Sequence, residues 1–437
     1  MPQLHKKQRT LLQSYVRTFQ VGPTRNLDAQ YNAEYAALWQ SIGKDGPWRE
    51  WLDEFDLSNI AEFAFNQISD QVPTGFTGPL DDHLLPAVED QMRSFLESIP
   101  RPYHVCFELP RFSKYGVPQI NLSSNVSIIE TINGAFEGIV SHTNQLRGLF
   151  ELGSEPGRKL KPDTVYLRFF VPGYANWSLS SYSPARAFAR LKHLFVLGSI
   201  DGRLRHSLLE QFVADTSSSF ISRPDVHVVA YNPDNPDHES YQLHFPDQAT
   251  KYLSWFRIND ENLTVHDGKN ATTLLVGRPA ETTMDKAEAL PFAFASTMRL
   301  QGLDDSNKDA DRIRAALEWY FDADTAENST VAFLQRCIGL EAILGDDENS
   351  RTSPLTDRLA DRYAYLMGHT PSERSELRGQ FREVYGHRSD VIHSRKAAGS
   401  VDFRTDTSAK AMLANVIRRE YWGLIRSLGQ SKGPGTN

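Results

Sequence analysis

The sequence is poor in cysteine and has no long apolar segment. Only Cys106 and Cys337 occur among its 437 residues, which excludes a disulfide framework and a cysteine-bound zinc ion. No apolar run approaches the roughly 20 residues that span a bilayer, and the N-terminus lacks the apolar stretch of a signal peptide. We therefore expect a cytoplasmic protein that does not cross a membrane.

Common cofactor and metal signatures are missing as well. The chain has no phosphate-binding glycine–lysine loop, no dinucleotide-binding glycine fingerprint and no His-Glu-x-x-His pair. We therefore expect no cofactor and no metal. The net charge of −8 argues against a protein that coats nucleic acid along its whole surface, but it is compatible with a local basic site.

The chain is too long for one ordinary hydrophobic core, and the periodicity of its apolar residues changes twice along the sequence. Residues 1–100 show helical periodicity, residues 101–300 are β-rich, and residues 301–430 return to helical periodicity. The sequence therefore predicts an α+β protein with an N-terminal helical region, a central sensing or regulatory domain and a C-terminal helical bundle. The central domain is expected to be an antiparallel sheet or a sandwich.

Local patterns place the individual elements. Short β-branched and aromatic runs predict strands at residues 103–109, 119–129, 164–171, 226–231, 241–245, 252–258 and 272–276. A helix interrupts them, with Ser183 as N-cap and Pro184 at the first helical position. In the last third, helices are expected at about residues 313–320, 329–344, 354–366, 371–385 and 407–428. A capping box from Thr370 to Glu373 opens the fourth of these.

The segment 385–396 carries the residues best suited to chemistry. It contains Arg388 and His393 with four residues between them, in a run that is both basic and periodically apolar. Arginine clamps a phosphate with a planar, permanently charged fork, and histidine moves a proton near neutral pH. Such a pair is the smallest set of side chains that metal-independent RNA cleavage requires.

Spacing alone does not single this pair out, because the chain has 13 histidines and chance matches are expected. Comparable pairs are Arg186/His193, Arg362/His369, Arg382/His387 and Arg388/His393. Arg186 and His193 are expected at the surface of the helix within the β-rich region. His369 follows a glycine, where a histidine complements a helix C-terminus.

Helix geometry adds a condition for Arg388 and His393. Residues five apart on an unbroken helix diverge by about 140° at roughly 100° per residue, so the two side chains of one chain would not point at one phosphate. The geometry works if the helix ends near His393 or if a second copy completes the site. A two-fold dimer places two arginines and two histidines around one cleft.

Four segments in order carry a family resemblance. They are residues 312–320, 333–344, 359–366 and the Tyr–Arg–Ser–His signature within residues 385–393. Together they make residues 304–428 resemble a HEPN domain, the small helical bundle of many prokaryotic RNases, and in particular its Apea-like branch. The resemblance covers less than a third of the chain.

The resemblance implies a set of site residues. Arg388 and His393 would be catalytic at a homodimer interface, and Glu341 and Asp390 would be auxiliary. Glu341 would either orient the arginine or serve as a structural acid of its helix. Ser389 follows the arginine where many active members carry asparagine, histidine or aspartate, and Ser394 stands where glycine is common. Substrate binding would fall to Ser389, His387, Arg395 and Lys396. The basic residues around the site also fit a solvated helix face balanced by Glu373, Glu376, Glu383 and Asp390.

The implied activity is that of a metal-independent endoribonuclease. Arg388 would neutralise the phosphate, and His393 would act as general base or acid, leaving a 2′,3′-cyclic phosphate. The expected partners are RNA, a second copy or a higher homo-oligomer, and a phage or nucleotide trigger sensed by the preceding regions. The expected setting is anti-phage defence by abortive infection, or toxin-like growth arrest.

Two other functions remain open at this stage. One is a non-catalytic HEPN module that binds RNA, a nucleotide or a protein partner, with the N-terminal regions as ligand sensor. The other is a carbohydrate- or ligand-binding protein led by the aromatic residues of the β-rich region. These are Tyr166, Phe169, Tyr174 and Trp177, residues that are more often core than a sugar platform.

Overall fold

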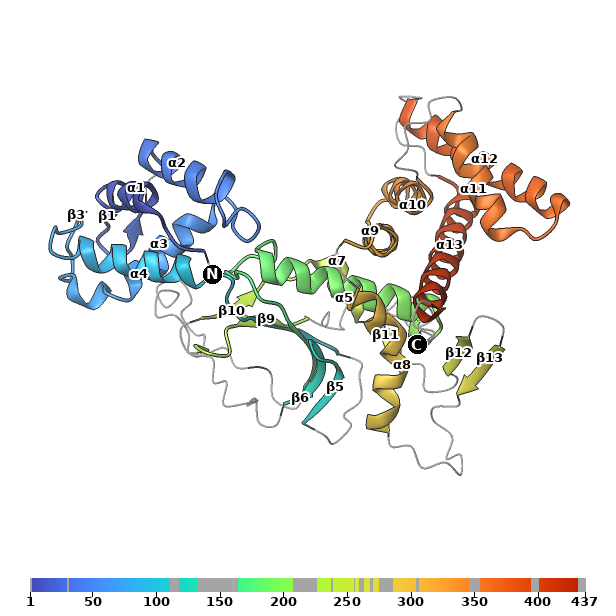
Figure 1. Ribbon diagram of the computed structural model, residues 1–437, viewed down its shortest axis with the longest axis horizontal. Coiled ribbons are helices and arrows are strands. Elements are labelled where there is room, and N and C mark those ends of the chain that lie inside the picture. The colour runs from blue at the N-terminus through green and yellow to red at the C-terminus, as the bar shows by residue number, and fades with distance from the viewer. Residues whose placement is uncertain are drawn as a thin grey trace, which may run out of the picture.

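The chain folds as an α+β protein with helices at both ends and an antiparallel sheet between them (Figure 1). The computed structural model describes residues 2–29, 31–110, 118–131, 160, 164–206, 226–236, 239–254, 256–258, 263–267, 270–274, 286–303, 306–345, 354–393 and 401–430. None of the helices within these ranges combines the length and apolar character that a bilayer crossing needs.

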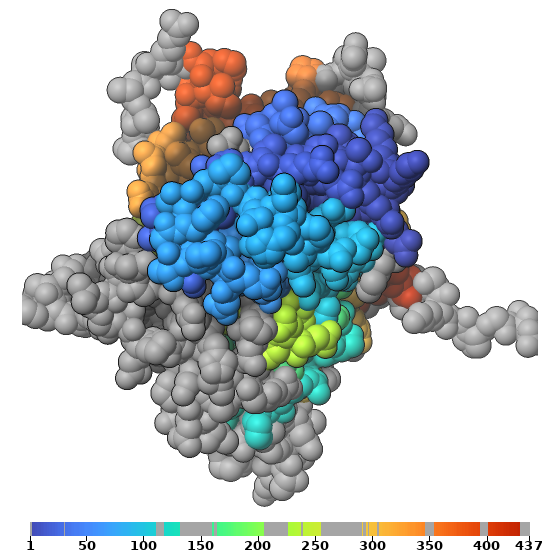
Figure 2. Space-filling view, turned by 90° about the vertical axis from the view of Figure 1, so that its left-hand side faces the viewer, coloured from blue at the N-terminus to red at the C-terminus, as the bar shows by residue number. Residues whose placement is uncertain are grey.

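The N-terminal region has a core of its own, which runs from Leu4 to Ile99 and adds only Tyr174 from elsewhere. Its helices are α1 (Lys6–Val16), α2 (Ala33–Trp39), the π-helical turn η1 (Gln40–Lys44), α3 (Asp56–Asn66), the 3₁₀ turn η2 (Ser69–Gln71) and α4 (Leu85–Ser98). Strands β1 (Gln20–Val21), β2 (Leu27–Asp28) and β3 (Gly78–Pro79) form a small sheet. Figure 2 views the molecule from the side of this region, which forms one continuous unit there.

A six-stranded antiparallel sheet forms the middle of the molecule, in the order β10-β9-β4-β7-β6-β5. Its strands are β4 (His104–Glu108), β5 (Gln119–Ser123), β6 (Val126–Glu130), β7 (Val165–Phe170), β9 (Val228–Tyr231) and β10 (Ser240–Leu243). Alternate residues of β4, such as Val105 and Phe107, face the same core as helix α5 (Tyr182–Ile200). Figure 1 shows α5 lying along this sheet.

Smaller elements connect the sheet to the C-terminal helices. They are β8 (Leu204–His206), α7 (Asp247–Leu253), β11 (Phe256–Ile258), β12 (Leu263–Asp267), β13 (Asn270–Leu274) and α8 (Lys286–Gln301). Strand β11 pairs with β8, and β12 pairs with β13.

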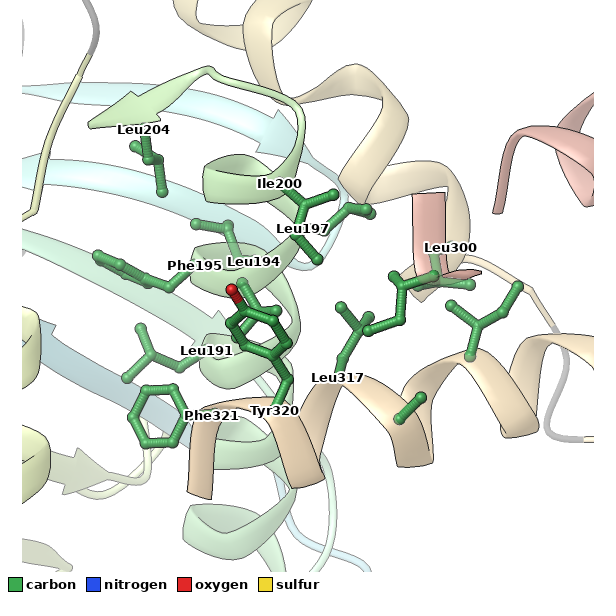
Figure 3. Close-up of a cluster of buried hydrophobic side chains, with 14 of the residues drawn as sticks. Leu191, Leu194, Phe195, Leu197, Ile200, Leu204, Leu300, Leu317, Tyr320 and Phe321 are labelled. Carbon is green, nitrogen blue, oxygen red and sulfur yellow. The ribbon is translucent and has the colours of Figure 1, made fainter. Parts of the chain in front are cut away.

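Five helices follow, in the number and order that the periodicity predicts. They are α9 (Lys308–Thr325), α10 (Ser329–Leu344), α11 (Leu355–Met367), α12 (Pro371–His393) and α13 (Phe403–Gln430). Helix α9 packs on α5 through Leu317, Tyr320 and Phe321 (Figure 3). These residues belong to one cluster of buried side chains, so the hydrophobic core of the sheet continues into the helical bundle. Full burial of a leucine such as Leu317 contributes about 1.5–3 kcal/mol to stability.

Several expected boundaries need correction. The run 119–129 is two strands, because Ser124 and Asn125 form a turn within it. Residues 252–258 divide between the end of α7 and β11. Helix α5 starts one residue before the expected N-cap, with Ser181 in that position. Within the described ranges the six-stranded sheet packs on helix α5 and not on a second sheet.

Candidate functional site

Helix α12 carries the predicted catalytic residues, and local chemistry explains where it begins. The capping box is present: the Thr370 N–H donates to Glu373 Oε2 (3.1 Å), and the Glu373 N–H donates to Thr370 Oγ1 (3.2 Å). Pro371 then occupies the first helical position. The helix continues without a break through Arg388 to His393.

An aromatic stripe fixes the rotation of α12. Phe381 and Tyr385 are buried one turn apart, and their rings stack with centroids 5.2 Å apart. Phe381 also contacts Tyr363 of α11, at 5.4 Å between ring centroids. Because residues three apart lie near the same side of a helix, Arg388 follows Tyr385 along this stripe toward α10.

Arg388 is held by two groups. Its Nη2 lies 2.9 Å from Oε1 of Glu341 on α10, and the Tyr385 hydroxyl donates to the same carboxylate oxygen. The Arg388 Cζ also lies 5.3 Å from the centroid of the Tyr385 ring. The Arg388 side chain keeps 27% of its surface accessible, so the guanidinium is oriented without being enclosed.

The surroundings of this pair set two protonation states. Burial, followed by the hydrogen bond to Glu341, raises the pKa of Tyr385, so its phenol remains a hydrogen-bond donor at neutral pH. Burial also raises the pKa of the Cys337 thiol, to about 12, although nearby Arg388 opposes the shift. Cys337 is therefore protonated and unsuited to nucleophilic catalysis.

His393 occupies the last described turn of α12 and is exposed. Since the helix is unbroken between Arg388 and His393, the two side chains leave it in directions about 140° apart. Neighbouring Ile392 is 48% exposed. A single chain therefore presents the arginine and the histidine on different sides of α12.

The other predicted residues fall into two groups. His387, Ser389 and Asp390 are exposed on α12. The pKa of the Asp402 carboxyl is lowered mainly by hydrogen bonds from Thr405, and the charge of His387 adds to that effect. Arg395 and Lys396, like Ser394, lie outside the described residues.

Arg378 and Arg382, two of the basic residues of α12, are balanced by acids, as expected for a solvated helix face, but these acids belong to another helix. Arg378 lies 2.5 Å from Asp361 and Arg382 lies 2.8 Å from Asp357, both on α11. These two pairs partly neutralise the middle of α12. Any further positive charge that attracts a phosphate to Arg388 would come from residues closer to the C-terminus of α12.

One charged group was not anticipated from the sequence. Arg336 on α10 is only 5% exposed and pairs with Asp324 of α9 (2.9 Å) and with Asp406 of α13. Lys410 lies 2.7 Å from Asp324 and completes the network. The sequence gives one sign of this buried charge, an arginine within the apolar run 333–344. It does not identify the acidic partners, which lie on other helices.

Two further expectations can be compared with the structure. Arg186 is exposed, whereas His193 is buried, so the surface position expected for His193 was wrong. The aromatic residues of the β-rich region are mostly core, since Tyr166, Phe169 and Tyr174 are no more than 2% exposed and Trp177 is 40% exposed.

The described residues contain no group of three or more histidine, cysteine, aspartate or glutamate side chains arranged to hold a metal ion. Comparisons of the chain with protein-family models, with curated proteins and with solved structures found no match.

Proposed function

We propose that residues 304–428 act as a HEPN-type, metal-independent endoribonuclease with Arg388 and His393 as catalytic residues. The observation that carries the proposal is the position of Arg388. It is oriented by Glu341 and Tyr385 while 27% of its side chain stays accessible. A guanidinium held in this way is organised in advance for a phosphate.

The proposed chemistry uses the ribose of the substrate. The 2′-hydroxyl oxygen attacks the phosphorus and its proton passes to one histidine, while the bond from phosphorus to the 5′-oxygen breaks. The second histidine protonates the departing oxygen. The products are a 2′,3′-cyclic phosphate and a 5′-hydroxyl, and DNA resists cleavage because it lacks the nucleophile.

The proposed active form is a two-fold dimer, because Arg388 and His393 of one chain leave α12 on different sides. Apolar exposure at this end of the bundle supports a partner surface: Ile392 is 48% exposed and Phe403 is 83% exposed. A second copy burying these side chains would bring the histidine of one chain toward the arginine of the other. In this proposal, residues 1–300 restrain or trigger a nuclease that arrests growth during phage infection.

The direct test is cleavage of total RNA by the purified protein in EDTA. Arg388→Ala and His393→Ala are expected to lower the rate by about 100-fold or more. Matched controls are Arg382→Ala, whose side chain pairs with Asp357, and His369→Ala, which is exposed. Cleavage that persists in both catalytic variants would contradict the proposed site.

One observation favours a second function, a non-catalytic module that binds RNA. In a single chain the charge of Arg388 is already partnered by Glu341, and the histidine points elsewhere. Such a module would retain RNA in an electrophoretic mobility assay, would leave it uncut in every variant, and would bind more weakly after Arg388→Ala.

A further inference from the structure

Helices α11 and α12 lie side by side (Figure 1) and are joined along one side by three pairs of side chains. The paired residues are four apart on each helix, so each set follows one helix face. Two pairs are ionic, Asp357 with Arg382 (2.8 Å) and Asp361 with Arg378 (2.5 Å). In the third, Arg374 meets the ring of Tyr365, with Cζ 4.6 Å from the ring centroid. An aromatic ring therefore stands where a third carboxylate would continue the pattern.

The Tyr365 ring is accessible to a ligand. The residue is 63% exposed, and within the described ranges its only side-chain interaction is with Arg374. Since the guanidinium lies over one face of the ring, an exposure this large leaves the opposite face open. A second planar group can stack there.

Arg374 is oriented but keeps donors for a ligand. Its Nε–H donates to the Gly368 carbonyl oxygen (3.1 Å), and a Cβ built on Gly368 would lie 2.9 Å from Arg374 Cγ, so the side chain packs on the backbone. No ion pair joins Arg374 to an acid in the described part of the chain, and its Nη1 and Nη2 atoms are neither hydrogen-bonded nor buried there. These two nitrogens can donate to a phosphate.

The neighbouring acid, Glu373, is engaged elsewhere. Its Oε2 accepts from the backbone N–H groups of His369 (2.7 Å) and Thr370 (3.1 Å). These two bonds are the main cause that lowers the pKa of the Glu373 carboxyl, and the charge of Arg374 contributes less. Glu373 therefore caps the start of α12 and does not form an ion pair with Arg374.

We propose that Tyr365 and Arg374 form a subsite for one nucleotide of single-stranded RNA, which rests on the proposed function and deepens it. The base would stack on the open face of the Tyr365 ring, and the phosphate would accept from Arg374 Nη1 and Nη2. Every base has a planar face, so the subsite would tolerate any sequence. Bases within a duplex already stack on each other, so the subsite selects unpaired RNA.

The subsite is separate from the candidate catalytic residues. Arg374 and Arg388 lie 14 residues apart on the unbroken helix α12, which places them about 21 Å apart along its axis at 1.5 Å per residue. This is farther than a dinucleotide extends. Tyr365 and Arg374 would therefore hold longer RNA and take no part in breaking the bond.

Fluorescence anisotropy of the full-length protein with a labelled decamer of 2′-O-methyl RNA tests binding apart from cleavage, because this RNA lacks the nucleophile. Tyr365→Ala should weaken binding about tenfold, and Tyr365→Phe, which keeps the ring, should bind as the wild type does. Arg374→Gln should weaken binding severalfold and make the dependence of log K on log salt shallower by about 0.7.

Matched controls lie in the N-terminal region. Tyr31→Ala removes another exposed tyrosine, and Arg49→Gln removes another exposed positive charge. Both should leave binding of the decamer unchanged. An effect of the same size in the controls would overturn the proposal.

Cleavage assays separate this proposal from the proposed function. In Tyr365→Ala, the KM for an unmodified RNA decamer should rise about tenfold, while cleavage of a dinucleotide stays at the wild-type rate. Decamer binding that depends on Tyr365, with no cleavage by any form, would contradict the nuclease and support the subsite. Unchanged binding in folded Tyr365→Ala and Arg374→Gln would overturn the subsite even where cleavage depends on Arg388. A loss of dimer in Tyr365→Ala with unchanged RNA binding would overturn it too.

Discussion

Two arginines on or beside helix α10 are held in different ways. Arg336 is 5% exposed and is shared between Asp324 and Asp406. Among the described residues, Arg388 has one carboxylate partner, and it keeps 27% of its side chain accessible. The first has no surface left for a ligand, while the second has orientation and access together, which is the combination that recognition of a phosphate requires.

The difference between them follows from the cost of burial. A buried guanidinium needs several acceptors, because desolvation outweighs a single pairing. Arg336 obtains them from α9 and α13 and thereby joins three helices. Arg388 lies at the edge of the apolar stripe, so one carboxylate and the Tyr385 ring suffice. The same residue type is therefore structural in one position and available for function in the other.

The largest expected effect is on Arg336. Arg336→Met leaves Asp406 without this buried partner and Asp324 with only part of its network, and should lower the free energy of unfolding by about 3–5 kcal/mol. Urea unfolding followed by circular dichroism measures the change. The control is Arg378→Met, which removes a partly exposed pair with Asp361 and should cost under about 1 kcal/mol. An equal loss of unfolding free energy in the two variants would contradict the claim that the buried pairs of Arg336 stabilise the fold more than the exposed pair of Arg378.

A buried acid that has no cationic partner in the described part of the chain extends the comparison to pH. Asp56 is 2% exposed, accepts from Asn176 Nδ2 at 2.7 Å, and has its pKa raised to about 7, chiefly by burial. Folding therefore favours its protonated form. The contribution to stability is fully present below the unfolded-state pKa of about 4 and is lost as the pH rises to about 7.

The loss should be on the order of 3 kcal/mol between pH 4 and pH 7. It is measured as the difference in unfolding free energy between the wild-type protein and Asp56→Asn at each pH. The wild-type protein should lose stability relative to the variant over this interval. A difference that stays constant with pH would contradict the assignment.

A smaller effect is expected from changing Glu341, the carboxylate that pairs with Arg388. Glu341→Gln can still accept from the Tyr385 hydroxyl but loses the charge that orients the guanidinium, so RNA cleavage should fall about tenfold in kcat. Glu376→Gln, an exposed acid on the same helix as Arg388, should have no such effect. A fall in thermal stability with an unchanged kcat would assign Glu341 a structural role alone.

The smallest expected effect is on the stability of Arg388→Ala. Because the pair with Glu341 is more than a quarter accessible on both sides, its removal should cost under about 1 kcal/mol of unfolding free energy. Thermal unfolding at two salt concentrations measures this. A loss as large as that of Arg336→Met would show that Arg388 is also structural.

Much of the bundle could be predicted because its signals are local. Helix α10 has the expected bounds, from Ser329 after its Asn328 cap to Leu344 before Gly345. The capping box at Thr370 is formed as predicted. Each of these signals involves residues within one turn of the helix end, so no knowledge of the tertiary structure was needed.

What escaped prediction depends on contacts distant in sequence. The partner of His193 is Glu318, 125 residues away, and a partner of Arg336 is Asp406, 70 residues away. The burial of His193 and of Arg336 could not be inferred from helical periodicity, since an apolar stripe shows only which side of a helix faces the core. The contact between Glu341 and Arg388 was anticipated through the family resemblance, because helical periodicity does not pair residues on different helices.

The central claim is that Arg388 of one chain works with His393 of another. The most direct measurement is RNA cleavage by a mixture of the Arg388→Ala and His393→Ala proteins, produced together so that mixed dimers form. Each variant alone should be inactive, and the mixture should recover part of the cleavage. A mixed dimer retains one arginine and one histidine from opposite chains, and water replaces the second histidine as the proton donor to the departing oxygen. A mixture as inactive as its two components would contradict the account.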